Sequence, residues 1–556
     1  MARALARSRG LKAVYATDIA PGATFDYVIV GAGSAGCVLA NRLSADGKHT
    51  VLLLEAGGKD TNHNIHVPIL VANILRDENL TWPLQTEPQN FLKGQRQLWV
   101  QGKVLGGSSS INGNLYVRGD PQEYDSWLAQ GCPGWGYADL LPYFKKLEDF
   151  PSGDAAVRGR GGPVGCTQLR DFDPLSNAFL AACEQAGSPR REDYNDGHSY
   201  EGTFYSQYST RRGFRSSTAV AYLRPAVKRQ NLTVVTHALS TRVLFEGKRA
   251  TGIEFLVGEQ KRSVRANREV ILSAGALHTP QLLELSGVGN AEILKSRGIA
   301  PMHDLPGVGE NLRDHTATRL TFECNQRITI NDIARSPWLK MKEGLRFAFK
   351  REGLLTISSS TAQTNLRASP KSERADLLLR LQPFSGKDRY ARTPKLGMDM
   401  FPGFTMSIGI LNPRSVGHLH VKSPDPREQA AMDPRYLSDD RDLQMYVQGI
   451  RIARSVASQP ALKGLIVRET RPGRVVDGED AIVDYIKSTV QTSWHMVGTC
   501  RMGTDDMSVV DPQLRVHGLA NLRVVDASVF PTIPSSNTNI PTIAVAEKAA
   551  DLIARL

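Results

Sequence analysis

The chain has 556 residues, of which 41% are hydrophobic and 22% are charged, and its formal net charge is +12. One hydrophobic core rarely serves more than roughly 250–300 residues, so we expect two domains. Lys and Arg are scattered and not interleaved with aromatic residues, which argues against a basic nucleic-acid-binding protein. No run reaches the roughly 20 apolar residues that span a bilayer.

The N-terminal stretch MARALARSRGLKAVYAT is basic and has no apolar segment of the kind found in a secretory signal. Six cysteines are spread over the chain without a C-x-x-C or a zinc spacing. His418 and His420 stand two residues apart, but no third ligand accompanies them. We therefore expect reduced thiols, no metal and a cytoplasmic protein.

The strongest local signal is FDYVIVGAGSAGCVLANRLSADGKHTVLLLEAG. Residues 25–30 form a short apolar run that predicts a buried parallel strand. Gly31, Gly33 and Gly36 follow as G-x-G-x-x-G, and the residues after them have helical apolar spacing. A second buried strand ends at Glu55, 19 residues after the third glycine.

This unit has the chemistry of a dinucleotide cradle. Gly31 permits a tight turn, Gly33 lets the backbone approach a pyrophosphate, and Gly36 lets helix and strand pack closely. The N–H groups and dipole at the helix N-terminus favour the pyrophosphate charge, and Glu55 is placed to accept ribose hydroxyls. The sequence therefore predicts an ADP-containing cofactor, and this unit alone does not distinguish NAD from FAD.

Four further stretches follow. Residues 102–119, GKVLGGSSSINGNLYVRG, are small and predict a loop that can lie against a large flat ligand. LSAGALHTPQLLELSGVG and DLPGVGENLRDH come next, the latter ending at His315. Near the C-terminus, LRVVDAS predicts a strand ending at Asp526. Apart from these four, the stretch QTSWHMVGTCRMG holds His495, and a lone histidine is more often structural than catalytic.

These stretches and the cradle occur in the order found in the glucose–methanol–choline (GMC) family of FAD-dependent oxidoreductases, which the chain resembles from about Asp26 to Ile553. Within that family it is most similar to bacterial alcohol dehydrogenases and hydroxymethylfurfural oxidase. The resemblance implies an α/β fold with a Rossmann-like FAD-binding domain and a substrate domain built on an antiparallel sheet. The FAD-binding domain would be discontinuous, with residues 20–165, 225–320 and 495–556. The substrate domain would comprise residues 166–224 and 321–494.

The resemblance also assigns residues to FAD. The ADP half would be held by Gly31, Gly33, Gly36 and Glu55, and adenine by the backbone of Val243. The flavin and pyrophosphate would meet Val104, Gly107, Asn112, Asn114, Asp526, Ala527, Asn539, Pro541 and Thr542. Ile111 stands where some members carry a histidine that binds FAD covalently, so a non-covalent flavin is expected.

By the same resemblance His495 removes the alcohol proton while hydride passes to flavin N5. A neutral imidazole suits this task, because its ordinary pKa of about 6.5 lies near working pH. Its partner would be Asn539, 44 residues further on, or Asn537 if the register differs by two. An amide can donate to the substrate oxygen without competing for the proton. Trp494 would form an apolar wall of the substrate pocket.

The expected reaction is oxidation of a primary alcohol, with an aromatic or furanic one favoured, and oxygen or a quinone as electron acceptor. Two other activities occur on the same fold. Fatty-acid photodecarboxylases are expected to lack the base at position 495 and to carry a cysteine and an arginine in the region of GLLTISSSTAQTNLR, which has no cysteine. A hydroxynitrile lyase would also use the histidine but would not reduce the flavin. The particular alcohol, the acceptor and the oligomeric state are left open by the sequence.

Overall fold

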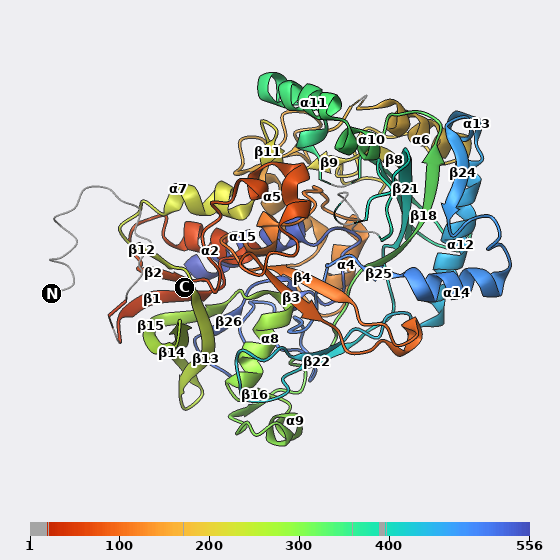
Figure 1. Ribbon diagram of the computed structural model, residues 1–556. Coiled ribbons are helices and arrows are strands. Elements are labelled where there is room, and N and C mark those ends of the chain that lie inside the picture. The colour runs from red at the N-terminus through yellow and green to blue at the C-terminus, as the bar shows by residue number, and fades with distance from the viewer. Residues whose placement is uncertain are drawn as a thin grey trace.

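The computed structural model describes residues 19–20, 22–170, 172–358, 360–388, 395 and 397–555, so the basic N-terminal stretch lies outside the described residues. The chain builds two sheets that lie at opposite sides of the molecule (Figure 1). Each sheet has its own cluster of buried hydrophobic residues. No helix among the described residues combines the length and the apolar character needed to cross a membrane.

The first sheet has the strand order β12-β2-β1-β15-β14-β13, with β26 paired to β15. Its centre is parallel, because the apolar runs at 27–30 and 51–54 are buried on both faces. The strands are β1 (Thr24–Val30), β2 (Val51–Leu54), β12 (Leu232–Val235), β13 (Ala238–Glu246), β14 (Arg249–Val257), β15 (Gln260–Leu272) and β26 (Leu522–Val524). Strands from both ends of the chain therefore share one sheet.

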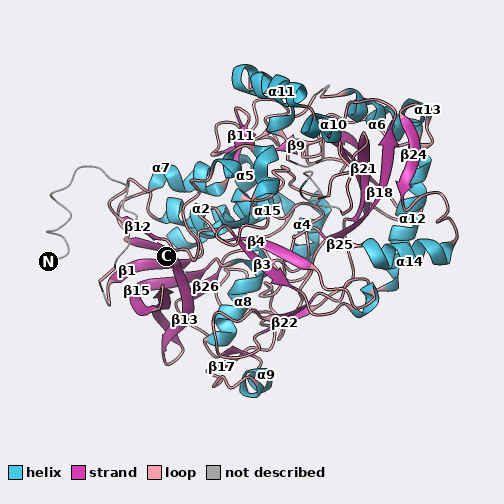
Figure 2. Ribbon diagram, in the orientation of Figure 1, coloured by secondary structure: helices cyan, strands magenta, loops and turns pink. Residues whose placement is uncertain are grey.

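Helices α2 (Ser34–Leu43) and α15 (Asn539–Ala554) contact each other beside this sheet, and α5 (Tyr137–Leu147) contacts α15 (Figure 2). Helix α2 starts directly after the turn that follows β1. A Cβ at Gly36 would lie 1.9 Å from the Gly31 carbonyl oxygen, so helix and strand approach as closely as the glycine motif predicts.

The second sheet is antiparallel, with the order β24-β18-β21-β20-β19-β8 and β25 paired to β18. Helices α6 (Pro174–Gln185) and α12 (Asp440–Ala457) contact this sheet. The strands are β8 (Gly202–Tyr205), β18 (Thr316–Cys324), β19 (Ala362–Leu366), β20 (Leu377–Gln382), β21 (Gly403–Ile410), β24 (Ile466–Arg471) and β25 (Gln491–Thr492). The domain junction expected at residue 320 falls inside β18.

The other elements are shorter or lie around these two sheets. The helices are α3 (His63–His66), α4 (Pro121–Ala129), α7 (Arg224–Ala226), α8 (Gly275–Leu285), α9 (Ala291–Ser296), α10 (Ile330–Arg335), α11 (Pro337–Lys350), α13 (Pro460–Lys463) and α14 (Glu479–Thr489). A hairpin is formed by β3 (Thr81–Gln85) and β4 (Leu98–Gly102). The remaining strands are β5 (Glu148–Asp149), β6 (Val164–Gly165), β7 (Thr167–Gln168), β9 (Gln207–Tyr208), β10 (Thr210–Arg211), β11 (Phe214–Arg215), β16 (Val288–Gly289), β17 (His303–Asp304), β22 (His418–His420) and β23 (Ala431–Asp433).

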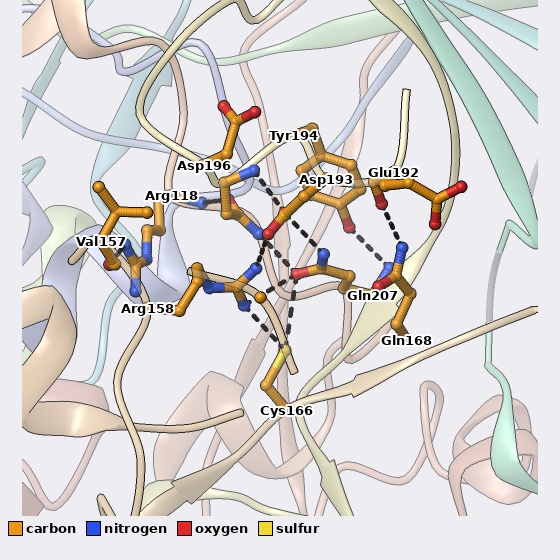
Figure 3. Close-up of polar contacts among 12 residues, drawn as sticks. Arg118, Val157, Arg158, Cys166, Gln168, Glu192, Asp193, Tyr194, Asp196 and Gln207 are labelled. Atoms are coloured by element: carbon orange, nitrogen blue, oxygen red, sulfur yellow. Dashed lines mark hydrogen bonds and ion pairs between the residues drawn. The ribbon is translucent and has the colours of Figure 1, made fainter. Parts of the chain in front are cut away.

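A buried ionic cluster ties the loop after α5 to the segment that leads into the second sheet. Glu148 accepts hydrogen bonds from Arg118 and Arg158, and these three side chains are almost fully buried. Arg158 also pairs with Asp193 and donates to Gln207 (Figure 3). Because each buried charge meets an opposite charge or a polar atom, removing one partner would leave a strongly disfavoured isolated charge.

Candidate active site

A cavity lies between the two sheets. From the first sheet and its turns it is lined by Gly31, Gly33, Glu55, Ala527 and neighbours. From the second sheet it is lined by residues of β18, β20 and β21, and the loop 493–496 and residues 536–539 complete it. Of the residues predicted for the site, twelve line this cavity: Gly31, Gly33, Glu55, Gly107, Asn112, Asn114, Trp494, His495, Asp526, Ala527, Asn539 and Thr542.

At the nucleotide end of the cavity, Gly31 and Gly33 have different roles, as the glycine motif predicts. Gly31 has a φ of +94°, and a Cβ there would lie 2.5 Å from the Ser273 carbonyl oxygen. A Cβ at Gly33 would meet nothing nearer than that oxygen at 3.9 Å. Gly31 is thus required by the fold, whereas Gly33 leaves room for a ligand that approaches the backbone.

Glu55 stands at the end of β2 and is buried. Its Oε2 accepts from the Ala32 N–H and its Oε1 from the Gly57 N–H, both at 2.8 Å. Burial raises the pKa of Glu55 to about 7. Each carboxylate oxygen has a second lone pair, so the same side chain can also accept ribose hydroxyls.

Asp526, at the end of β26, organises the start of α8 on the other side of the cavity. Its carboxylate accepts from the Gly275 N–H at 2.8 Å and from the Thr279 hydroxyl at 2.6 Å. Burial raises the pKa of Asp526. The side chain therefore fixes the helix start against the cavity, beside Ala527 in the lining.

The loop of residues 102–119 supplies polar side chains to the wall of the cavity. Asn112 accepts from Arg215 at 2.7 Å, and Asn114 has a left-handed φ of +57°. The Oδ1 atom of Asn114 is buried and has no hydrogen-bond partner in the described part of the chain. A buried orphan acceptor beside a cavity fits a ligand that brings an N–H or O–H donor, as FAD does.

Four predicted cofactor residues do not line the cavity. Gly36 packs α2 against β1, as described above. Val243 is buried within β13, and its N–H donates to Ser286 Oγ at 2.9 Å; the cavity instead meets the start of that strand, residues 238–240. Val104 is buried beside Gly58, and Pro541 is buried inside the first turn of α15.

His495 is placed by strand pairing. Strand β25 pairs with the start of β18, which brings the residues just beyond them together. His315 Nδ1 lies 3.1 Å from His495 Nδ1, with the two rings perpendicular. His315 Nε2 lies 2.8 Å from the Leu411 carbonyl oxygen, which can only accept. Neutral His315 therefore carries its proton on Nε2 and accepts at Nδ1, so His495 carries its proton on Nδ1.

The side chain at the other nitrogen of His495 is Asn537. His495 Nε2 is 2.9 Å from Asn537 Nδ2, and Asn537 Oδ1 accepts from Arg380 Nη2 at 2.8 Å. Asn539 begins α15, and its Oδ1 accepts from Ser34 Oγ at 2.7 Å. The structure therefore brings together His495 and Asn537, the alternative partner, whereas Asn539 contacts Ser34 at the start of α2.

Hydrogen bonds hold the loop that carries the histidine. The His495 N–H donates to Asp314 Oδ1 at 2.7 Å, and Thr492 Oγ1 donates to the other oxygen of that carboxylate at 2.5 Å. Trp494 has a left-handed φ of 61°, and its Nε1 donates to the Leu98 carbonyl at 2.9 Å. A bulky residue in this conformation is strained, and such strain is typical of functional sites.

Sequence reasoning missed three residues of this network. His315 ends the DLPGVGENLRDH motif, but nothing in the local sequence indicates a role for it. Asp314 precedes it, and Arg380 lies in a segment without a clear pattern. Their contacts join residues more than 150 positions apart, which no local motif reports.

The parallel sheet and the glycine-lined cavity are typical of proteins that bind a nucleotide cofactor, and comparisons with known proteins identify the class. Two family models match the chain, both described as GMC oxidoreductase, over residues 25–317 and 413–546. The chain is 42% identical to the alcohol dehydrogenase (acceptor) of Pseudomonas putida over 96% of both chains. It is 39% identical to the mitochondrial choline dehydrogenase of Homo sapiens, over 95% of this chain and 89% of that one.

Solved structures of similar proteins lead to the same family. Pyridoxine 4-oxidase from Mesorbium loti superposes with a TM-score of 0.85 at 30% identity, over 96% of this chain and 99% of that one. A formate oxidase from Aspergillus oryzae, studied for modification of its FAD, gives 0.89 at 25% identity, over 97% and 99%. The chain therefore belongs to the GMC oxidoreductase family of FAD-binding flavoproteins.

Proposed function

We propose that this protein oxidises a primary alcohol to an aldehyde with FAD, and that His495 is the base. The observation that carries the proposal is the 2.9 Å contact of His495 Nε2 with Asn537 in a cavity shared with the nucleotide cradle. The names of the relatives, an alcohol dehydrogenase and choline dehydrogenases among them, support the same class of reaction.

The residues present fit FAD. Glu55 and Gly33 would hold the ADP half, and the orphan acceptor of Asn114 would take a donor of the cofactor. Ile111 is buried in the cavity lining and offers no nucleophile, which supports the proposal of a non-covalent flavin. When bound, FAD supplies the two-electron acceptor that takes the hydride from the alcohol carbon.

The protein residues handle the proton. A hydroxyl inserted between Asn537 and His495 would accept from the amide and donate to Nε2, which matches the polarity of the direct contact. As hydride leaves the carbon with two electrons, His495 removes the hydroxyl proton. The alcohol thus loses one hydride and one proton and becomes an aldehyde. General-base help of this kind is typically worth about 10²–10⁴-fold.

The hydrogen bonds around His495 keep its Nε2 atom unprotonated, so that it can accept a proton. The Leu411 carbonyl holds the proton of His315 on Nε2, so His315 accepts from His495 and leaves His495 Nε2 unprotonated. The positive charge that His495 gains is then shared along the same hydrogen bond. Trp494, Leu378 and Ile410 are apolar parts of the lining and suit an aromatic or furanic alcohol.

We infer that the enzyme works in a reducing compartment, with the cytoplasm as the proposed location. All six cysteines are free and buried. Oxygen or a quinone completes the cycle, and reoxidation of the reduced enzyme by each, followed in the same stopped-flow instrument, identifies the acceptor.

The test is anaerobic reduction of the bound flavin by benzyl alcohol and other primary alcohols. We expect the wild type to bleach at 450 nm, and His495→Ala to retain the flavin yet reduce it at least about 10²-fold more slowly. Near-normal reduction by that variant would remove His495 from the role. A wild-type flavin that no alcohol bleaches would instead point to a lyase in which the flavin stays oxidised.

A further inference from the structure

Arg380 lies on the face of β20 that lines the cavity. Leu377, Leu379 and Leu381 alternate along this strand and are fully buried in the core of the second sheet. Side chains of a strand point to opposite faces in turn, so residues 378, 380 and 382 face the other way, and all three line the cavity. The arginine is thus a part of the site wall and not a surface charge.

The guanidinium stands next to the reacting groups. Its Nη2 donates to Asn537 Oδ1 at 2.8 Å, and its Nε donates to Gln363 Oε1 at 3.3 Å. Asn537 in turn contacts His495. The positive charge therefore lies one side chain away from the place where the alcohol oxygen is expected.

The charges of the cavity are divided between its two ends. Among the described residues that line it, the carboxylates are Glu55 and Asp526, and both belong to the nucleotide end. Arg380 is the one lysine or arginine in that lining, and it belongs to the substrate end. Trp82 and Trp494 are the lining residues with large aromatic rings, so the described wall offers neither a carboxylate nor a multi-ring cage to a cationic substrate.

We propose that Arg380 makes the enzyme select alcohols that carry a carboxylate and reject alcohols that carry a quaternary ammonium group. A guanidinium binds a carboxylate with charge-assisted hydrogen bonds, and it repels an ammonium group in a cavity of low dielectric constant. This proposal rests on the proposed alcohol oxidation. The proposed selection distinguishes this chain from relatives named choline dehydrogenase. In sequence identity the chain is about equally similar to those relatives and to an alcohol dehydrogenase.

Two matched pairs of substrates test the selection. The first pair is 4-(hydroxymethyl)benzoate and its neutral amide, and the second is choline and its neutral analogue 3,3-dimethylbutan-1-ol. The measured quantity is the second-order rate constant of anaerobic flavin reduction. We expect the wild type to prefer the benzoate over the amide, and the neutral butanol over choline, each on the order of 10- to 100-fold.

Arg380→Gln keeps a donor for Asn537 but removes the charge, so both preferences, each taken as a ratio of rates within the same variant, should shrink to within about threefold. Arg380→Lys should retain part of the preference. Arg367→Gln, which removes an equal charge from a half-exposed position just beyond β19, is the control and should leave both ratios unchanged. A binding readout accompanies the rates: unreactive benzoate should perturb the oxidised flavin spectrum at lower concentration than benzamide, except in Arg380→Gln.

Equal wild-type rates within each pair would overturn the proposal, and so would preferences that survive in Arg380→Gln. If Arg380→Gln does not fold with flavin, the wild-type ratios and Arg380→Lys still decide. Failure of the oxidation itself looks different, because then neither the neutral amide nor the neutral butanol reduces the flavin.

Discussion

His315 determines which nitrogen of His495 can act as a base. His315→Leu removes the acceptor for the Nδ1 proton of His495, and a lost hydrogen bond to a charged partner corresponds to roughly 10- to 100-fold in rate. We expect the limiting rate of flavin reduction to fall by that factor, with little change in substrate affinity. His315→Gln, which offers a carbonyl acceptor, should recover part of the rate.

Because His315 acts through His495, the pH profile is the informative measurement. Stopped-flow reduction from about pH 6 to 9 should rise with pH in the wild type, since the base must be neutral, and the midpoint should move in His315→Leu. An unchanged rate and an unchanged midpoint would show that His315 only fills space.

The two asparagines make a matched pair. Asn537→Ala removes the donor at the substrate oxygen and should slow reduction on the order of 10²–10³-fold while the flavin stays bound. Asn539→Ala removes the acceptor of the Ser34 hydroxyl at the start of α2, so we expect weaker FAD binding with a near-normal rate in the loaded enzyme. The opposite result for the pair would restore Asn539 as the partner of His495.

At the scale of elements, two glycines of the turn between β1 and α2 serve different purposes. Gly31 is needed for folding, and Gly33 is needed for cofactor binding. Gly33→Ala places a methyl group in open space at the cavity, so the apoprotein should keep a melting temperature close to wild type but bind FAD weakly. Gly31→Ala places a Cβ 2.5 Å from a backbone oxygen at a positive φ, so little soluble protein should be obtained. The checks are flavin content at 450 nm and the melting temperature of the apoproteins. Normal flavin content in Gly33→Ala would contradict this role of the turn.

The same elements show what a sequence can and cannot predict. The cradle was predictable because its strand, glycines and acid are contiguous and each residue answers a local requirement. The register of Asn537 and Asn539 was not, because both lie in a Ser/Asn/Pro-rich stretch and the choice depends on where α15 begins. Arg380 could not be found at all, since its partner stands 157 positions away on another element.

At the scale of the whole molecule, His420 links α8 to the β22–β23 hairpin. Burial opposes a charge on His420, but hydrogen bonds to Glu284 and Glu310 outweigh it and raise the pKa to about 9. A folded pKa above the ordinary 6.5 gives stability that is complete below about pH 6.5 and is lost as the pH rises through about 9. The contribution is on the order of 3 kcal/mol.

The melting temperature should therefore fall between about pH 6.5 and 9, and His420→Gln should flatten that fall. His418→Gln is the control, because burial lowers the pKa of His418 and its effect belongs to lower pH. A wild-type melting temperature that is constant across this range, or one that falls equally in His420→Gln, would show that the bridge does not carry the dependence.

The first sheet is assembled from both ends of the chain, and this has a consequence for synthesis. Strand β1 needs β15 and β2 at its sides, β15 needs β26, and α2 packs against α15, which ends at residue 554. The nucleotide-binding half therefore cannot complete its core until α15 has left the ribosome. We expect chaperones that hold unfinished chains to govern the yield of this enzyme in cells, and a stop codon ahead of α15 to give aggregated product and not a shortened flavoprotein.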